Sequence, residues 1–409
     1  MREAFRIGRL FGIDIGIDWS WGLIFLLMAW NLTATFLIWH PIWSFGMSFI
    51  VAVIAAILFF ASVVAHELAH ALVAGSFGVH VHEIRLFLFG GVASLDREPP
   101  SPAAEFWTAI VGPLVSFALG FLFVLIASFM VPTTVDLADP WDTLAHLGPI
   151  ATLLSWLGPI NILIGVFNLI PGFPLDGGRI LRAALWRLTG NLHKATLTSS
   201  LIGKAIGWIF VIMGIAMVFG AWIPFFGRGA VGGIWLAFIG WFLSIAAERS
   251  YGALLVQDAL HGVRVSTLMR RESRTVPPDT SVRAIASEWF MRSSERAFPV
   301  VADGKLLGLV CIADVRKVPE DTWSHTPITA IMTPREQLAV VAPDEDALAA
   351  LRKFAELDVD QLPVVEREDR FAGMITRSQV ARWLELHLGG RSPYALRSTH
   401  VEEAGLRHA

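Results

Sequence analysis

Charged side chains are scarce in this sequence. Only 16% of its 409 residues are Asp, Glu, Lys or Arg, whereas 55% are hydrophobic and the mean hydropathy is +0.59. From Trp19 to His66 none of these four residue types occurs. A run of about 20 apolar residues is long enough to cross a bilayer as a helix. The composition therefore excludes an ordinary soluble protein and predicts a membrane protein.

Cysteine, basic runs and a secretory leader are also missing. The single cysteine, Cys311, excludes an internal disulfide framework and a multi-cysteine metal site, and we expect it as a small buried side chain on a strand. The net charge of -3, with no basic run, indicates no nucleic-acid partner. Residues 1–12 are basic but lack a compact apolar core followed by a cleavage site, so we expect no cleaved signal peptide.

The charges that are present lie mostly in the last third of the chain. This asymmetry predicts two parts, an apolar front and a soluble rear. We expect a membrane domain over residues 1–250. Two repeats should follow over 262–320 and 325–388, and the Gly, Ser and Pro content after 389 predicts a flexible tail over 389–409.

Uninterrupted charge-free stretches give the membrane helices. The run from Trp19 to His66 is long enough for two, with His40-Pro41 marking the turn between them. Four more stretches follow, over 106–135, 143–175, 205–227 and 229–247. We therefore predict six transmembrane helices.

Basic residues in short loops predict the orientation. Arginines precede the first helix, and a second basic group follows the fourth: Arg2, Arg6 and Arg9, then Arg179, Arg182, Arg187 and Lys194. The connection after the third helix is acidic instead, with Asp136, Asp139 and Asp142. Both termini should then be cytoplasmic. The carboxyl-terminal ends of helices two and four should both lie on the cytoplasmic side, at one depth in the membrane.

The first charge-free run ends in the HExxH sequence His66-Glu67-Leu68-Ala69-His70. Positions i and i+4 share one face of a helix, so His66 and His70 can bind one metal ion with Glu67 beside it as a base. A chance match at a membrane edge is the alternative. Ionisable groups at membrane depth are costly and usually functional, so we favour a metal site inside the bilayer.

A catalytic zinc ion needs a third protein ligand and an open water position. The segment from Asn168 to Gly178, NLIPGFPLDGG, offers Asp176 at the end of a later span. Its prolines and glycines break regular helix, and irregular backbone at membrane depth is tolerated where it is buried or lines a wet cavity. An ordinary helix exit would also explain these turn-forming residues.

HExxH on one span and Asn-x-x-Pro-x-x-x-Leu-Asp-Gly-Gly on a later one together resemble the site-2 protease family of intramembrane zinc metalloproteases. The resemblance covers about residues 1 to 250. It implies one zinc ion per chain, bound by His66, His70 and Asp176. It also implies that Glu67 activates water and that Asn168 lies near the substrate carbonyl; a packing hydrogen bond between helices is the less favoured alternative for Asn168. Gly112-Pro113 also fits the family, whereas Ser116 departs from the Asn often found there, so we assign Ser116 no chemical role.

Residues 84–95 read as two short apolar strands around a glycine turn, beside the catalytic helix. Such a β-hairpin could hold an unwound substrate as an added strand. A re-entrant element that only packs is the alternative. His80 and His82 alternate on the preceding strand, but interfacial histidines are usually solvated, so we do not predict a second metal site there.

The rear part contains an internal repeat. Val276-Pro277-Pro278-Asp279 returns as Val341-Ala342-Pro343-Asp344, and Phe298-Pro299-Val300-Val301 returns as Leu362-Pro363-Val364-Val365. Each unit is typical of extended segment, helix, strand, strand and helix. The repeat resembles a tandem pair of cystathionine-β-synthase (CBS) domains.

The CBS resemblance implies paired packing and, in many members, an adenine nucleotide in the clefts. The usual contact pattern is a Ser or Thr followed three residues later by Asp. The first copy has Cys311 and Asp314, and the second has Thr376 and Gln379, so neither is complete. Asp314 and Thr376 are the candidate nucleotide contacts. A structural module, including a homodimer through the CBS domains, is the alternative.

The expected fold is a polytopic α-helical membrane protein, with about six transmembrane helices and a small β-hairpin, followed by an α/β cytoplasmic CBS pair. The resemblance implies an intramembrane zinc endopeptidase, and the absence of organelle-targeting signals together with the compact build favours a bacterial or archaeal cell membrane. Its partners would be the lipid bilayer and single-span membrane protein substrates such as anti-sigma factors or membrane-tethered regulators. Two other classes stay open: a CBS-regulated transporter or channel, and a zinc-binding membrane adaptor without proteolysis.

Overall fold

The structure is a computed structural model that describes residues 5–87, 90–95, 98–131, 140–293 and 295–388. The predicted tail over 389–409 and the acidic residues Asp136 and Asp139 lie outside the described residues. The chain divides into two compact units, one ending at Tyr251 and one beginning at Gly252. We describe each unit by itself.

Among the described residues, six helices are long and apolar enough to cross a membrane, as predicted. They are α1 (Trp19–Trp39), α2 (Phe45–Ser76), α3 (Pro102–Ser128), α5 (Pro149–Asn168), α7 (Leu192–Val218) and α8 (Ala230–Leu260). Two shorter helices, α4 (Pro140–His146) and α6 (Asp176–Thr189), lie between them. Polar caps begin several helices, as where Asp18 accepts from Ser20 N and Ser44 accepts from Met47 N.

The predicted helix ends were wrong where charged residues continue a helix beyond its apolar run. Helix α7 starts at Leu192 rather than 205 and so includes Lys194 and Lys204, and α8 continues past 247 to Leu260. In contrast, the single stretch predicted over 143–175 is divided between α4 and α5, and α5 already ends at Asn168. Charge-free length therefore locates the membrane helices but not their ends.

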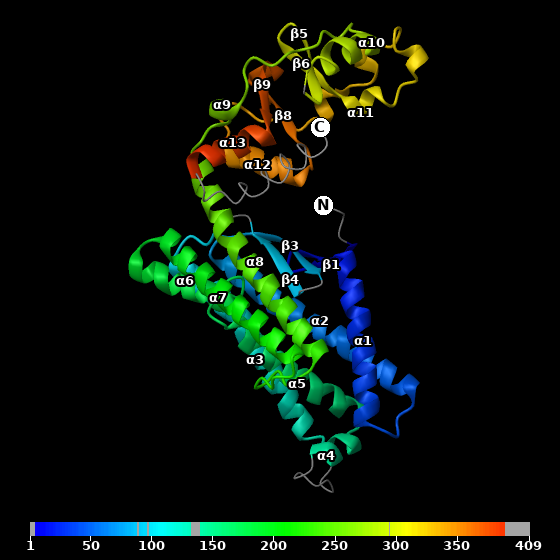
Figure 1. The fold of residues 1–409 in the computed structure, drawn as a ribbon, viewed down its shortest axis with the longest axis vertical. Coiled ribbons are helices and arrows are strands. Elements are labelled where there is room, and N and C mark those ends of the chain that lie inside the picture. Colours follow the sequence, from blue (N-terminus) through cyan, green and yellow to red (C-terminus); the bar gives the residue numbers. More distant parts are fainter. Residues whose placement is uncertain (1–4, 88–89, 96–97, 132–139, 294, 389–409) are drawn as a thin grey trace. The chain divides into compact units, whose positions relative to one another are not determined.

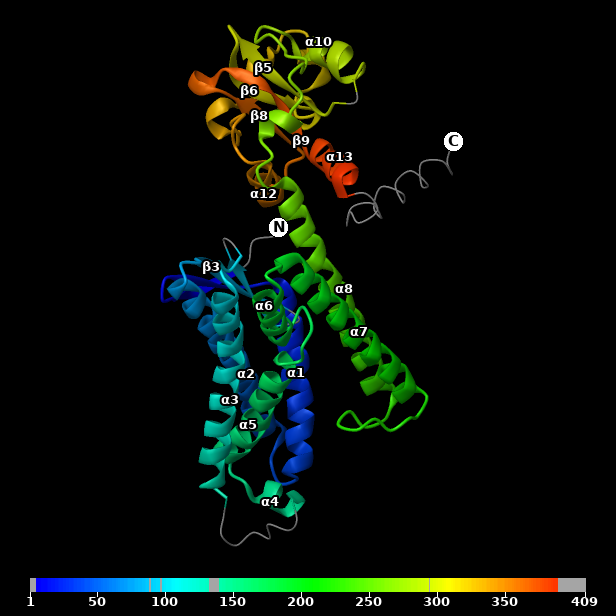
Figure 2. The same cartoon turned by 90° about the vertical axis from the view of Figure 1, so that its left-hand side faces the viewer.

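Helix α3 is central to the membrane unit, since it packs against α2, α5 and α6 (Figures 1 and 2). Glycines permit its close approach to α5. A Cβ atom added at Gly120 would lie 2.9 Å from Ile162 N and 3.0 Å from Gly158 O. Small residues at such crossings are typical of helix pairs in membranes.

A four-stranded sheet lies at one end of the helix bundle, and α4 lies at the other (Figures 1 and 2). Its order is β1 (Phe5–Leu10), β2 (Ile13–Ile17), β3 (Val81–Phe87) and β4 (Gly90–Leu95). The predicted hairpin is present as β3–β4, but the N-terminal strands were not predicted. Because β2 pairs in parallel with β3, strand β3 is internal and β4 is at the edge.

The second unit contains the two predicted repeats. The first consists of α10 (Val282–Ala284), a π-helical segment (Ile285–Phe290), β5 (Ala297–Ala302), β6 (Lys305–Cys311) and α11 (Ile312–Val315). The second consists of α12 (Ala347–Glu356), β8 (Gln361–Val365), β9 (Phe371–Thr376) and α13 (Arg377–Leu388). In both, an extended residue pairs in parallel with the following strand, Val276 with Val300 and Val341 with Val364. The short α9 (Val265–Leu268) precedes the first repeat, and β7 (Thr333–Pro334) joins its sheet.

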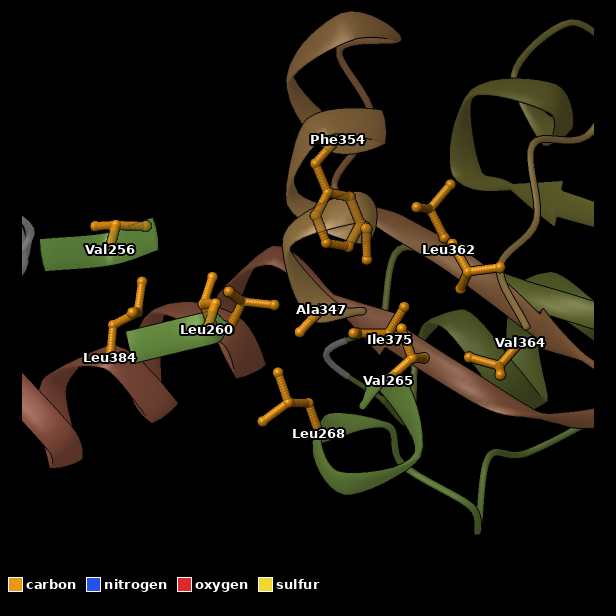
Figure 3. Close-up of a cluster of buried hydrophobic side chains, with 13 residues drawn as sticks. Val256, Leu260, Val265, Leu268, Ala347, Phe354, Leu362, Val364, Ile375 and Leu384 are labelled. Carbon is orange, nitrogen blue, oxygen red and sulfur yellow. The ribbon is translucent and has the colours of Figure 1, made fainter. Parts of the chain in front are cut away.

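The core of the second repeat includes the end of α8. Val256 and Leu260 are buried among side chains from α12, α13 and the two strands, and Phe354, at 1% exposure, lies in the same cluster (Figure 3). The last long apolar helix is therefore continuous in sequence with a helix turn that completes the core of the second repeat.

Candidate metal centre

Three side chains from two helices converge in the membrane unit. His66 and His70 lie one turn apart on α2 and are 4% and 6% exposed, and Asp176 is the first residue of α6. Asp176 Oδ2 is 3.1 Å from His66 Nε2 and 3.2 Å from His70 Nε2, and the two Nε2 atoms are 3.1 Å apart. The sequence-predicted ligand set is thus brought together in space.

This triangle of atoms fits a tetrahedral zinc ion. Zinc–nitrogen bonds of about 2.0–2.1 Å separate tetrahedral ligand atoms by roughly 3.3 Å, close to the observed spacing. His70 Nδ1 lies 2.5 Å from the Thr108 carbonyl oxygen, which can only accept, so Nδ1 carries the proton and Nε2 presents a lone pair. A lone pair facing a carboxylate and a second imidazole is repelled unless a proton or a metal ion lies between them, and the spacing suits a metal ion. Within the described residues this is the one group of three or more His, Cys, Asp or Glu with metal-binding spacing.

One stripe of α3 orients both histidines. Thr108 O accepts from His70 Nδ1, and four residues later Gly112 lies directly beneath the imidazoles. Four residues further, Ser116 Oγ is 2.8 Å from His66 Nδ1. We assigned Ser116 no chemical role from the sequence, yet its position four residues after Gly112 and eight after Thr108, on one helix face, was a usable signal.

Asp176 is positioned by a tightly folded turn rather than by a continuous helix. A Cβ atom at Gly177 would lie 2.3 Å from the carbonyl oxygens of Leu169 and Ile170, and one at Gly178 would lie 2.3 Å from Phe173 N. Only glycine allows the start of α6 to fold this closely against residues 169–175. The Leu-Asp-Gly-Gly sequence therefore carries a steric requirement as well as a ligand.

Glu67 lies beside the triangle on α2 and forms no hydrogen bond to another described residue, which leaves its carboxylate free for a reactant. Strand β4 covers it, because a Cβ atom at Gly91 would lie 2.5 Å from Glu67 Cγ. The edge strand of the sheet therefore packs directly on the side chain predicted to act as base.

Asn168 is the last residue of α5 and is half-buried, and its side chain forms no hydrogen bond with any described residue. It is therefore not held by the packing hydrogen bond considered above. His80 and His82 are exposed and belong to no described group of metal-ligand spacing.

Comparison with known proteins identifies the family. The model of peptidase family M50 matches residues 54–138 and 130–213, and the CBS-domain model matches 265–321 and 328–386. Rip3 of Mycobacterium tuberculosis is 34% identical over 95% of this chain and 94% of its own length. The chain belongs to the site-2 protease family, peptidase family M50.

Two further proteins extend the comparison. The zinc metalloprotease MJ0392 of Methanocaldococcus jannaschii is 29% identical over 94% of this chain and 97% of its own. The solved site-2 protease from the same organism is 30% identical and covers 61% of this chain and 95% of its own, with a TM-score of 0.40. This site-2 protease is accordingly a multi-pass membrane zinc metalloprotease with a C-terminal CBS pair.

The two candidate nucleotide contacts of the CBS pair cap helices in this structure. Asp314 Oδ2 accepts from Cys311 N at 3.0 Å and Oδ1 accepts from Lys317 Nζ at 2.9 Å, at the start of α11. In the second repeat, Gln379 Oε1 accepts from Thr376 N at 2.8 Å, at the start of α13. The Ser/Thr-x-x-acid pattern is thus also a capping box.

A cleft of about 1000 Å³ opens elsewhere in the CBS unit of this protease. It lies between the β5–β6 turn, residues 340–345 and the β8–β9 turn, and neither Asp314 nor Thr376 lines it. Its walls carry both signs of charge, including the Arg335–Asp369 ion pair. Such a mixed lining points to no particular ligand.

Proposed function

We propose that this protease is an intramembrane endopeptidase that uses one zinc ion, held by His66, His70 and Asp176, to cut single-span membrane proteins near the cytoplasmic face. Anti-sigma factors and membrane-tethered regulators are the substrate class. The observation that carries the proposal is the triangle of three ligand atoms, two from buried histidines and one from the partly buried Asp176, each pair 3.1–3.2 Å apart. Three protein ligands leave a fourth position for water, as in catalytic zinc sites.

Glu67 and Asn168 have different proposed roles in the hydrolysis. A zinc ion in this site would supply a Lewis acid that lowers the pKa of a water molecule to about 7. Glu67, whose carboxylate has no other described partner, takes the proton from that water and later returns it to the leaving amine. Asn168 donates its amide N–H to the substrate carbonyl oxygen as negative charge develops there. Removing a donor of this kind costs about 3 kcal/mol in other hydrolases.

Strand β4 is the proposed clamp for substrate. A helical peptide bond is protected by its own hydrogen bonds, so the target must unwind and be held extended. Since β3 is internal, only β4 offers the hairpin's free edge, and its Gly91 touches Glu67. A peptide added along β4 would therefore pass beside the base.

We also propose a cytoplasmic location for both termini, with a membrane domain over 1–250 and CBS repeats over 262–320 and 325–388. The Arg-rich segment before α1 and the basic residues of α6 support this orientation. A Cys311-free chain with a cysteine at Ile42, in the α1–α2 turn, should react with an impermeant thiol reagent on intact cells. A cysteine at Gly8 should react only after permeabilisation, and the reverse pattern would contradict this topology.

The CBS pair is the proposed regulatory part, either through an adenine nucleotide contacted by Asp314 and Thr376 or through homodimer formation. Equilibrium binding of ATP and AMP to the full-length protein separates these roles. Binding that Asp314→Ala and Thr376→Ala weaken would support nucleotide sensing. A dimer by light scattering without nucleotide binding would support a structural role instead.

The zinc content of purified full-length protein in detergent tests the core of the proposal without a substrate. Wild type and Glu67→Gln should each hold about one zinc per chain, and His66→Ala and Asp176→Ala should lose it at equal folded fraction. Glu67→Gln should then trap uncut substrates. Zinc retained unchanged by Asp176→Ala would contradict the ligand set.

The other two function classes now have less support. A transport path should distribute polar groups through several spans, whereas here His66, Glu67, His70 and Asp176 meet at one place. An adaptor with a structural zinc would need neither Glu67 nor an open fourth position. Membership of a peptidase family also favours hydrolysis.

A further inference from the structure

A buried ion cluster beside the metal centre has no part in the chemistry described so far. Arg182, on α6, is 6% exposed, and its Nε donates to Glu105 Oε1 at the start of α3. A second guanidinium nitrogen donates to Glu98 Oε2 at 3.0 Å. Glu105 is fully buried, and its other oxygen has no hydrogen-bond partner among the described residues. Buried charges of this kind are costly unless they are paired.

The cluster joins α6, which begins with Asp176, to the helix face that holds the two histidines. Glu105, Thr108, Gly112 and Ser116 follow one another at spacings of three and four residues, so they form one stripe on α3. Thr108 and Ser116 orient His70 and His66, while Glu105 binds Arg182. The same stripe of α3 therefore supports all three candidate metal ligands. It hydrogen-bonds to the two histidines directly, and it supports Asp176 through the ion pair with Arg182.

The geometry makes Asp176 sensitive to this anchor. Arg182 lies six residues after Asp176, or roughly 9 Å along the helix axis. A tilt of α6 by about 6° about the anchor would move Asp176 by roughly 1 Å, while metal–ligand distances tolerate only about 0.2 Å. Leu175, the N-cap of α6, provides no side-chain hydrogen bond of its own.

The guanidinium also contacts the turn that delivers the ligand. Its central carbon lies 5.2 Å from the centre of the Phe173 ring, three residues before Asp176. Cation–π contact at this distance is attractive. Arg182 therefore fixes both the helix that begins at Asp176 and the turn that precedes it.

We infer that Arg182, paired with Glu105, is the positioning residue that holds Asp176 within bonding distance of the metal ion. This inference rests on the proposed zinc site. It assigns Arg182 no contact with substrate or metal, and it predicts that loss of the pair leaves a two-histidine site with weakened affinity.

The test compares metal binding by full-length variants in detergent. Zinc affinity is measured by competition with a chromogenic chelator, and the visible spectrum of bound Co²⁺ reports the ligand number and arrangement. Arg182→Met should raise the zinc Kd about 10- to 100-fold, the usual effect of losing a group that orients a ligand. Arg182→Lys should recover part of the loss. Arg187→Met, an exposed arginine of the same helix without a described ion pair, should match wild type.

A paired variant separates positioning from folding. Arg182→Met alone leaves Glu105 buried and unpaired, whereas Arg182→Met with Glu105→Met removes both charges and should keep the folded fraction of wild type. The paired variant should still show weakened zinc binding and a changed Co²⁺ spectrum. Wild-type affinity and spectrum in this folded variant would overturn the inference while leaving the zinc site intact. A wild-type protein that binds no zinc would overturn the proposed function and this inference together.

Discussion

Replacing Gly112 by alanine should abolish the metal site while leaving the helices intact. The added Cβ would lie 2.2 Å from His70 Nε2, 2.4 Å from His70 Cε1 and 2.7 Å from His66 Nε2. Contacts between such atoms are normally near 3.5 Å, so the His70 ring must move by roughly 1.3 Å. The ring cannot swing aside freely, because its Nδ1 is hydrogen-bonded to Thr108 O.

The required movement is several times the tolerance of about 0.2 Å for a metal–ligand distance. We expect zinc affinity to fall at least 100-fold, or about 2.8 kcal/mol, more than the usual loss from changing a group outside the ligand shell. The measurement is the zinc Kd by chelator competition, with circular dichroism confirming helix content. Gly75→Ala, on α2 with nothing within 4 Å of its new Cβ, is the matched control. Wild-type zinc affinity in folded Gly112→Ala would refute the reasoning.

Three further changes test other parts of the molecule. Gly91→Ala should displace Glu67 and lower peptide hydrolysis about 100-fold while the zinc content stays unchanged. Gly8→Ala, on a strand where the new Cβ meets open space, should change neither hydrolysis nor zinc content. A loss of zinc from Gly91→Ala as large as its loss of hydrolysis would contradict this. Leu260→Ala should lower the free energy of unfolding of the CBS unit by about 2–5 kcal/mol, measured by urea unfolding with proteolysis as the readout. Leu357→Ala, at a half-exposed position, should lower it by less than about 0.5 kcal/mol. Equal effects would mean that α8 is not part of that core. Burial, followed by the neighbouring Asp314 carboxylate, raises the pKa of the Cys311 thiol to about 11, so its alkylation rate should still climb between about pH 9 and 10; a plateau near pH 9 would count against this environment.

The sequence was most informative where a requirement is local. Charge-free length revealed six spans, and the i, i+4 spacing placed His66 and His70 on one helix face. The repeat predicted two similar units because each contains its own strands and helices. Helix ends were less predictable, since α8 continues through charged residues to reach an apolar core at Leu260.

Other features depend on residues far apart in the chain. Strands β1 and β2 were not predicted, although Ile13, Ile15 and Ile17 alternate with Asp14 and Gly16; every residue of β1 is exposed, and β2 pairs with β3, which lies far along the chain. The Arg182–Glu105 pair joins residues 77 positions apart, and on sequence alone Arg182 counted only as a basic residue of a cytoplasmic loop. Ser116 was set aside because it departs from a family pattern, whereas its contact with His66 depends on how α2 and α3 pack.

The candidate metal ligands come from two parts of the protein that are held in place by different contacts. The histidines rest on the α2–α3 contact, but Asp176 follows a turn that is pinned to α7, where Phe173 N donates to Ser199 O and a Cβ at Gly203 would lie 2.1 Å from Phe173 O. Neither part alone supplies three ligands, so the HExxH helix by itself would bind metal weakly. The three ligands meet only when α6 is held against α3. The buried Arg182–Glu105 ion pair joins these two helices, and this explains why an otherwise apolar unit contains two buried charges.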